Sequence, residues 1–119
     1  MTNWIVEFHD AFEPEFDDLD EDVQDAMLTA VLLLRSQGPR LGRSHADTLA
    51  GSKFVNMKEL RFRVRQGVWR VAFAFDPRRR AILLVASDKG GLDQMRFYQG
   101  LLRTADRRFA RYLDTLKGH

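Results

Sequence analysis

Residues 60–75 decide the fold, and they read Leu60-Arg61-Phe62-Arg63-Val64-Arg65-Gln66-Gly67-Val68-Trp69-Arg70-Val71-Ala72-Phe73-Ala74-Phe75. Apolar and basic side chains alternate over 60–65, and large side chains alternate with small or basic ones over 68–75. Such a period of two is typical of strands with one buried face. Gln66-Gly67 between them is a turn signal. The stretch predicts two antiparallel strands whose bulky face packs in the core.

The chain after residue 75 extends this pattern. Residues 76–80 predict another turn, and residues 81–86 are apolar on both faces, which places that strand inside the sheet. Residues 88–91 end the strand. Residues 92–116 predict an amphipathic helix, with an apolar face formed by Met95, Tyr98, Leu102, Ala105, Phe109, Tyr112 and Leu116.

The chain before residue 60 predicts a short strand at 4–8 and helical structure over 11–37. Pro14 either starts a helix or separates a short helix from a longer one, and Gly38-Pro39 stops the helix. Residues 40–53 form a long polar connection. We therefore expect one α+β domain over residues 1–119, in which an N-terminal strand and helices pack on a twisted, mainly antiparallel sheet, followed by a C-terminal helix.

Composition narrows the class of protein. The 119 residues include no cysteine, and no apolar run is long enough to span a bilayer. No export signal is visible, so we expect a cytoplasmic protein without a membrane role. Residues 1–34 carry ten acids and no lysine or arginine, whereas all nineteen basic residues lie at or after Arg35. This asymmetry indicates either a solvated acidic helix or a basic face that meets a polyanion.

Alternation places Arg61, Arg63 and Arg65 on one face of their strand. Arg70 lies between Ala72 and Ala74 in the next strand, so we expect open space above its side chain. Clustered guanidinium groups repel one another unless an anion covers them, and phosphate suits their bidentate geometry. The alternative is a solvated sheet face or an edge strand protected by charge.

Five further polar residues are weaker candidates. Lys89 follows the apolar strand, where a loop can aim it across the sheet. Tyr98 is either a core tyrosine or a residue that stacks on a base or assists proton transfer. His45 lies in the long connection and Arg96 begins a basic stripe on the last helix; both are compatible with plain surface roles. Lys58 has the parity of Leu60 and is expected to face the core unless the strand bulges.

Several chemistries have no signature here. The sequence has no nucleophile elbow, P-loop or dinucleotide fingerprint, and its three histidines lack metal-ligand spacing. The remaining hypothesis is metal-independent phosphoryl chemistry without a cofactor, in which RNA supplies its own 2′-hydroxyl nucleophile and arginines stabilise the phosphorane. The residues alone identify no general base.

Two segments carry a family resemblance: residues 56–61, Asn-Met-Lys-Glu-Leu-Arg, and residues 67–76, from Gly67 to Asp76. With Asp88-Lys89 and Arg96-Phe97-Tyr98, they resemble the phage-derived, HigB-type branch of the RelE/ParE toxin superfamily. The resemblance implies a RelE-like fold with RNA on a basic face, and catalytic roles for Arg70, Arg61, Lys89 and Tyr98. It also implies RNA contacts through Lys58, and Arg63, Arg65, His45 and Arg96 are further candidates for RNA binding.

The resemblance further implies the toxin of a type II toxin–antitoxin system. Such a toxin cuts mRNA on the ribosome, which inhibits translation and arrests growth. Its partner is an antitoxin, often a helix-turn-helix protein, and the two form a hetero-oligomer. Glu59 stands where RelE-like members often have a lysine, so the general base stays open. Two alternatives remain: a ParE-like toxin that binds gyrase, and an inactive prophage accessory protein.

Overall fold

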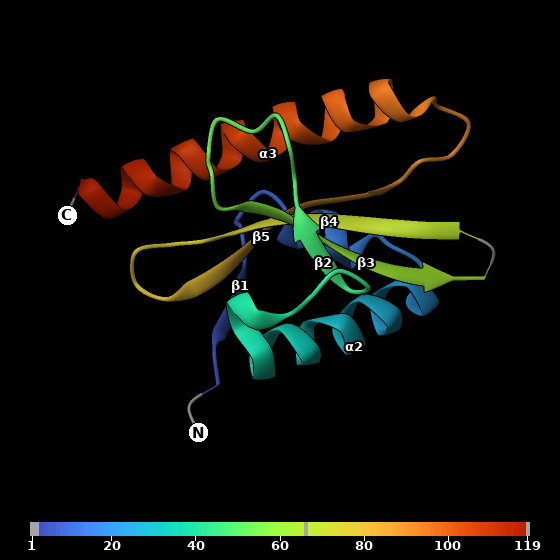
Figure 1. Ribbon diagram of the computed structural model, residues 1–119, viewed down its shortest axis with the longest axis horizontal. Coiled ribbons are helices and arrows are strands. Elements are labelled where there is room, and N and C mark those ends of the chain that lie inside the picture. Colours follow the sequence, from blue (N-terminus) through green and yellow to red (C-terminus); the bar gives the residue numbers. More distant parts are fainter. Residues whose placement is uncertain (1–2, 66, 119) are drawn as a thin grey trace.

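The computed structural model describes residues 3–65 and 67–118 of the chain. Its sheet has the order β1-β5-β4-β3-β2 (Figure 1). The strands are β1 (Ile5–Phe8), β2 (Ala46–Thr48), β3 (Met57–Val64), β4 (Gly67–Phe75) and β5 (Arg80–Asp88). β1 runs parallel to β5, and every other pairing is antiparallel. This confirms the expected mainly antiparallel sheet. The predicted turn at Gln66-Gly67 includes Gln66, which lies outside the described residues.

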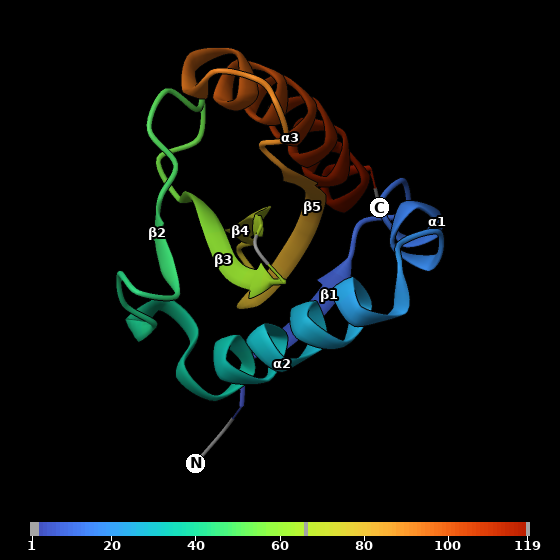
Figure 2. The same cartoon turned by 90° about the vertical axis from the view of Figure 1, so that its right-hand side faces the viewer.

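Helices cover both faces of the sheet, as the end-on view shows (Figure 2). Helix α1 (Glu13–Asp17) and helix α2 (Glu21–Gln37) lie on one side, and the long helix α3 (Gln94–Lys117) lies on the other. Pro14 occupies the first turn of α1, which confirms that it lies at a helix start; residues 18–20 separate this short helix from α2. Gly38 ends α2 with φ +56°, a conformation that glycine adopts without strain.

The bulky face of the β3–β4 hairpin packs against α1 and α2, as the alternation predicts. Leu60, Val71 and Phe73 are completely buried there against Met27 and Leu34 of α2. Burying large apolar side chains contributes roughly 1.5–3 kcal/mol each, so this cluster is a main source of stability. The same face carries Phe62 and Trp69, whose rings stack with centroids 6.5 Å apart.

The opposite face of the hairpin is also covered, which corrects the expectation of open space beside Arg70. Ala72 and Ala74 are fully buried under α3, where they meet Phe97, Leu101 and Phe109. Small side chains on a strand allow a helix to approach closely, and their size at these positions reflects that packing. The end of the sheet nearest the start of α3 keeps polar groups on this face, among them Glu59, Arg61 and Arg70.

Two further expectations need correction. Residues 40–53 contain the short strand β2, which pairs with β3 and is too short to show a period in sequence. The buried face of α3 includes the predicted Ala105 and Phe109, but at the start of the helix its most buried residues are Phe97 and Leu101, one residue before the predicted Tyr98 and Leu102. Met95 is consequently 71% exposed. No helix of the described residues is both long and apolar enough to cross a membrane.

Candidate active site

Four polar residues meet where the β3–β4 hairpin faces the first turns of α3. Arg61 and Arg70 lie directly opposite each other in the antiparallel register. Glu59 lies two residues before Arg61 on the same face of β3, and Tyr98 reaches this face from α3. We call Glu59, Arg61, Arg70 and Tyr98 the polar cluster.

Glu59 is the centre of the polar cluster. Its side chain is only 6% exposed, and its Oε1 atom lies 3.3 Å from Arg61 Nε and 3.4 Å from Arg70 Nε. Neither Nε atom makes a well-oriented hydrogen bond within the described part of the chain. The contacts of Glu59 with the two arginines are therefore ion pairs, and each Nε–H group can still donate a hydrogen bond to a ligand. A carboxylate between two facing arginines offsets the repulsion that their pairing would otherwise cause.

Arg70 is more enclosed than the sequence led us to expect. Its side chain is 19% exposed, and its guanidinium lies over the rings of Phe97 and Tyr98, 5.2 and 5.6 Å from their centroids. The earlier expectation of an open surface arginine is wrong, because α3 begins directly above it. The aromatic contacts and Glu59 restrict the guanidinium, and restriction of this kind preorganises a cation for an anionic ligand.

The hydroxyl of Tyr98 donates to the Glu59 carboxylate, with 2.9 Å to Oε1 and 3.1 Å to Oε2. Burial raises the pKa of Tyr98 above its ordinary value of 10.0, and the hydrogen bond and charge of Glu59 raise it further. Tyr98 therefore keeps its proton at neutral pH. It is a hydrogen-bond donor and a potential general acid, while Glu59 is the proton acceptor of the pair.

Two grooves open on either side of Arg61. One, of about 320 Å³, is lined by Ser44, Phe62, Val68 and the three arginines Arg61, Arg63 and Arg70. The other, of about 610 Å³, contains Glu59, Arg61 and Tyr98 beside apolar and amide side chains of α3 and the β2 segment. The first suits a phosphate. The second gives Glu59 and Tyr98 an approach from solvent.

The other predicted strand residues separate into two groups. Arg63 is exposed and lines the arginine groove. Arg65 does not share its face: it follows the end of β3 with φ +57° and pairs with Asp22 of α2 at 2.7 Å. Regular alternation ends at Val64, so the expectation of three arginines on one face is wrong. Lys58 is half-buried and has the parity of Leu60, away from the polar cluster.

The three remaining predicted residues, His45, Lys89 and Arg96, lie outside the polar cluster. His45 is exposed just before β2, and its carbonyl accepts the Arg61 N–H at 2.8 Å, so it is level with Arg61 at the sheet edge. Lys89 is exposed one residue after β5. Arg96 is exposed in the first turn of α3 and lies 3.8 Å from Asp93, which caps that helix by accepting the Arg96 N–H.

Sequence reasoning did not assign Glu59 a role in the site. A signal was available, because Glu59 has the parity of Arg61 and lies across the hairpin from Ala72. A single acid on the basic face of a strand is a natural partner for its cations. Among the described residues, no three His, Cys, Asp or Glu side chains are grouped to hold a metal ion.

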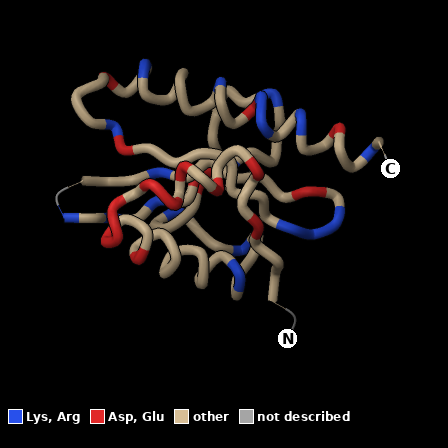
Figure 3. Tube along the Cα trace, turned by 180° about the vertical axis from the view of Figure 1, so that it is seen from behind, with Lys and Arg blue, Asp and Glu red and all other residues tan. Residues whose placement is uncertain are grey.

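Ion pairs within the fold neutralise part of the charge asymmetry seen in the sequence. Acids gather on α1 and the start of α2, while basic residues line α3 and the turns between strands (Figure 3). Three N-terminal acids pair across this division: Glu7 with Arg80, Glu15 with Arg108 and Asp22 with Arg65.

Residues 14–110 match the model of the family described as Phage derived protein Gp49-like (DUF891). The matched segment includes the whole polar cluster. The chain belongs to this Gp49-like family. Two proteins of Mycobacterium tuberculosis, named as the candidate toxins HigB2 and HigB3, are similar to this Gp49-like protein with 40% identity each. The HigB2 match covers 80% of this chain and 47% of HigB2, and the HigB3 match covers 84% of this chain and 85% of HigB3.

A solved structure shares the fold at low sequence identity. It is a double arginine-to-alanine mutant of the Escherichia coli toxin RelE in the free state, similar with a TM-score of 0.58 and 12% identity. The match covers 87% of this chain and 97% of that chain. The Gp49-like protein therefore has the RelE fold, which confirms the fold class predicted from the hairpin and its flanking helices.

Proposed function

We propose that this protein is the toxin of a type II toxin–antitoxin system and acts as a metal-independent, ribosome-dependent mRNA endoribonuclease in the cytoplasm. The toxin names of its relatives and its RelE fold support the first part. The polar cluster supports the second, because two facing arginines border a groove with room for a phosphate and contact a carboxylate paired with a protonated tyrosine. That juxtaposition is the observation that carries the proposal.

In the proposed reaction, the RNA phosphate lies in the arginine groove, held by Arg61 and Arg70 with Arg63 at its rim. The 2′-hydroxyl attacks the adjacent phosphorus, and its proton passes to Glu59. The bond from phosphorus to the 5′-oxygen breaks, and that oxygen takes the proton of Tyr98. The products are a 2′,3′-cyclic phosphate and a 5′-hydroxyl. Arg61 and Arg70 stabilise the charge of the phosphorane.

The pairing of Glu59 with Tyr98 also closes the proton balance. After one turnover Glu59 holds the proton of the 2′-hydroxyl and Tyr98 has lost one. Because their oxygens are 2.9 Å apart, the proton returns from Glu59 to Tyr98 and both groups are restored. Glu59 thus fills the role of general base that the sequence left open, in place of a lysine.

The proposed dependence on the ribosome agrees with the contacts that Glu59 makes in the protein without RNA. Glu59 is occupied by two arginines and Tyr98, so a bound phosphate must draw at least one arginine toward itself before the carboxylate is free. Ribosomal positioning of the RNA would supply the binding energy for that rearrangement. The proposed partner outside the ribosome is a cognate antitoxin, for which a helix-turn-helix protein is expected, in a toxin–antitoxin hetero-oligomer.

Mapping the 5′ ends of cellular RNA after induced expression tests this proposal. Wild type should arrest growth and create new 5′ ends inside reading frames, and Arg70→Lys should weaken both effects because lysine lacks the guanidinium fork. Growth arrest without new RNA ends would overturn the nuclease assignment and favour a ParE-like toxin. Absence of arrest by the folded wild-type protein would favour an inactive relative.

A further inference from the structure

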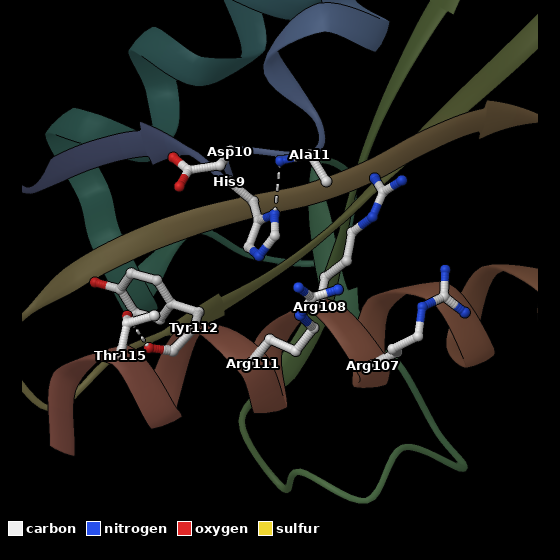
Figure 4. Close-up of a pocket in the computed structure, with 8 residues that line it drawn as sticks. All are labelled: His9, Asp10, Ala11, Arg107, Arg108, Arg111, Tyr112 and Thr115. Atoms are coloured by element: carbon white, nitrogen blue, oxygen red, sulfur yellow. Dashed lines mark hydrogen bonds between the residues drawn. The ribbon is translucent and has the colours of Figure 1, made fainter. Parts of the chain in front are cut away.

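A second basic pocket lies at the far end of α3 from the polar cluster. It has a volume of about 410 Å³ and is formed between the residues that follow β1 and the C-terminal half of α3 (Figure 4). Its charged and titratable lining residues are three arginines, one histidine and one carboxylate: Arg107, Arg108, Arg111, His9 and Asp10. Thirteen residues of helix separate Tyr98 from Arg111, so the two sites are about 20 Å apart along α3.

His9 offers an N–H group to this pocket. Its Nδ1 accepts the backbone N–H of Ala11 at 3.0 Å, so the proton of the neutral ring is on Nε2. Burial lowers the pKa of His9 and the charge of Arg108 lowers it further, against the smaller opposing effects of the Asp10 charge and of an interaction with the Arg108 backbone. A bound anion would compete with that backbone group for the ring N–H. Figure 4 shows the ring directed into the space above α3. An anion in the pocket would accept the Nε2 proton in a hydrogen bond.

The arginines of the pocket differ in their partners. Arg108 is fixed, because it forms a two-pronged pair with Glu15 at 2.9 and 2.6 Å and donates to the Leu84 carbonyl at 2.7 Å. Arg107 and Arg111 are exposed and form no ion pair within the described part of the chain. They are one helical turn apart, which places them about 6 Å from each other along the axis. Repulsion between such like charges is relieved by an anion.

We propose that this pocket binds a backbone phosphate of the RNA strand that the polar cluster acts on. His9, Arg107 and Arg111 supply its ligating groups, and Arg108 forms a fixed wall. RNA is favoured over an acidic peptide because exposed Arg103, one turn before Arg107, continues the basic line toward the polar cluster. An RNA strand has regularly spaced phosphates, so successive phosphates can contact these arginines in turn. The choice of RNA rests on the proposed function.

Binding of a non-cleavable 2′-O-methyl RNA, measured by fluorescence anisotropy over a range of salt concentrations, tests this inference. Arg107→Ala/Arg111→Ala removes two exposed charges, and Arg40→Ala/Arg78→Ala is the control of equal charge because both residues are exposed and lie outside α3. A long unstructured oligonucleotide can reach both sites, whereas a trinucleotide can occupy only one at a time.

We expect the pocket variant to bind the long RNA more weakly than the control does, with a salt slope reduced by about 0.7, the contribution of the one phosphate that the pocket would hold on a single strand. Binding of the trinucleotide at the polar cluster should persist. Equal losses in the two double variants would overturn the inference. So would displacement of RNA by a poly-glutamate peptide from wild type but not from the pocket variant, which would assign the pocket to an acidic protein.

The inference and the proposed function can fail separately. If Arg70→Ala leaves cellular RNA cleavage unchanged while the pocket variant loses RNA affinity, the pocket assignment stands and the catalytic assignment falls. The reverse result leaves the polar cluster as the only RNA site.

Discussion

The hydroxyl of Tyr98 and the carboxylate of Glu59 are joined at 2.9 Å across 39 residues of sequence. This contact connects the first turns of α3 to the β3–β4 hairpin through polar groups. It also places a protonated phenol and a proton acceptor beside two arginines.

Glu59→Gln should lower the rate of RNA cleavage by about a hundred-fold or more, because glutamine cannot accept the proton of the 2′-hydroxyl. The amide oxygen can still accept the Tyr98 hydrogen bond, so the fold is kept. Single-turnover cleavage of ribosome-bound message measures the rate, and thermal unfolding checks the fold. Full activity in a folded Glu59→Gln protein would exclude Glu59 as the base.

Tyr98→Phe and Tyr112→Phe form a matched pair, since each removes one α3 hydroxyl that donates to a carboxylate. Tyr98→Phe keeps the ring against Arg70 and should lose cleavage in a protein that still folds. Tyr112→Phe removes a donor from Asp76, whose side chain is completely buried, and should cost roughly 1 kcal/mol or more of stability with cleavage retained. Cleavage assays and urea unfolding measure the two effects. Lost cleavage in Tyr112→Phe together with retained cleavage in Tyr98→Phe would refute this division of roles.

Arg63→Ala and Arg65→Ala test which strand arginines meet RNA. Arg63 lines the arginine groove, whereas Arg65 pairs with Asp22 on the other side of the sheet. Arg63→Ala should weaken RNA binding several-fold and lower its salt dependence, and Arg65→Ala should change binding little. The same loss in both variants would point to the net charge of the protein rather than to the groove.

The buried carboxylate of Asp76 predicts a specific pH dependence of stability. Burial raises its pKa, but hydrogen bonds from Tyr112, from the backbone of Arg80 and Arg78, and from the Arg80 side chain outweigh burial, so its pKa is below the ordinary 3.8. The contribution is therefore present above pH 3.8 and is lost as the pH falls through the lowered value.

Urea unfolding of wild type and Asp76→Asn over a pH series measures that contribution. The difference in unfolding free energy should be constant at neutral pH and shrink as the solution becomes acidic below about pH 4. A difference that does not change with pH would show that the ionised form of Asp76 contributes nothing specific to stability.

The sequence predicted the parts of the fold that follow from periodicity. The alternation at 60–75 located β3 and β4 and their buried face, and Pro14 and Gly38 marked helix boundaries because their backbone preferences are local. Periodicity could not show that α3 returns over Ala72 and Ala74. The small side chains of these two residues are compatible both with open space and with close helix packing.

The candidate site was predicted in part for the same reason. Arg61 and Arg70 were placed together because strand pairing across a tight turn is readable from sequence. Glu59 was not assigned to them, since its burial depends on Tyr98 arriving from a helix 39 residues later. Arg65 was placed on the wrong face because the positive φ that ends β3 has no signature in an arginine.

Cleavage of a defined message on purified ribosomes, with wild type beside Arg70→Ala, tests the central claim most directly. The account predicts that wild type produces fragments with 2′,3′-cyclic phosphate and 5′-hydroxyl ends, and that folded Arg70→Ala loses at least about a hundred-fold in rate. Cleavage by folded Arg70→Ala at the wild-type rate, or the absence of cut message with active wild-type toxin, would contradict it.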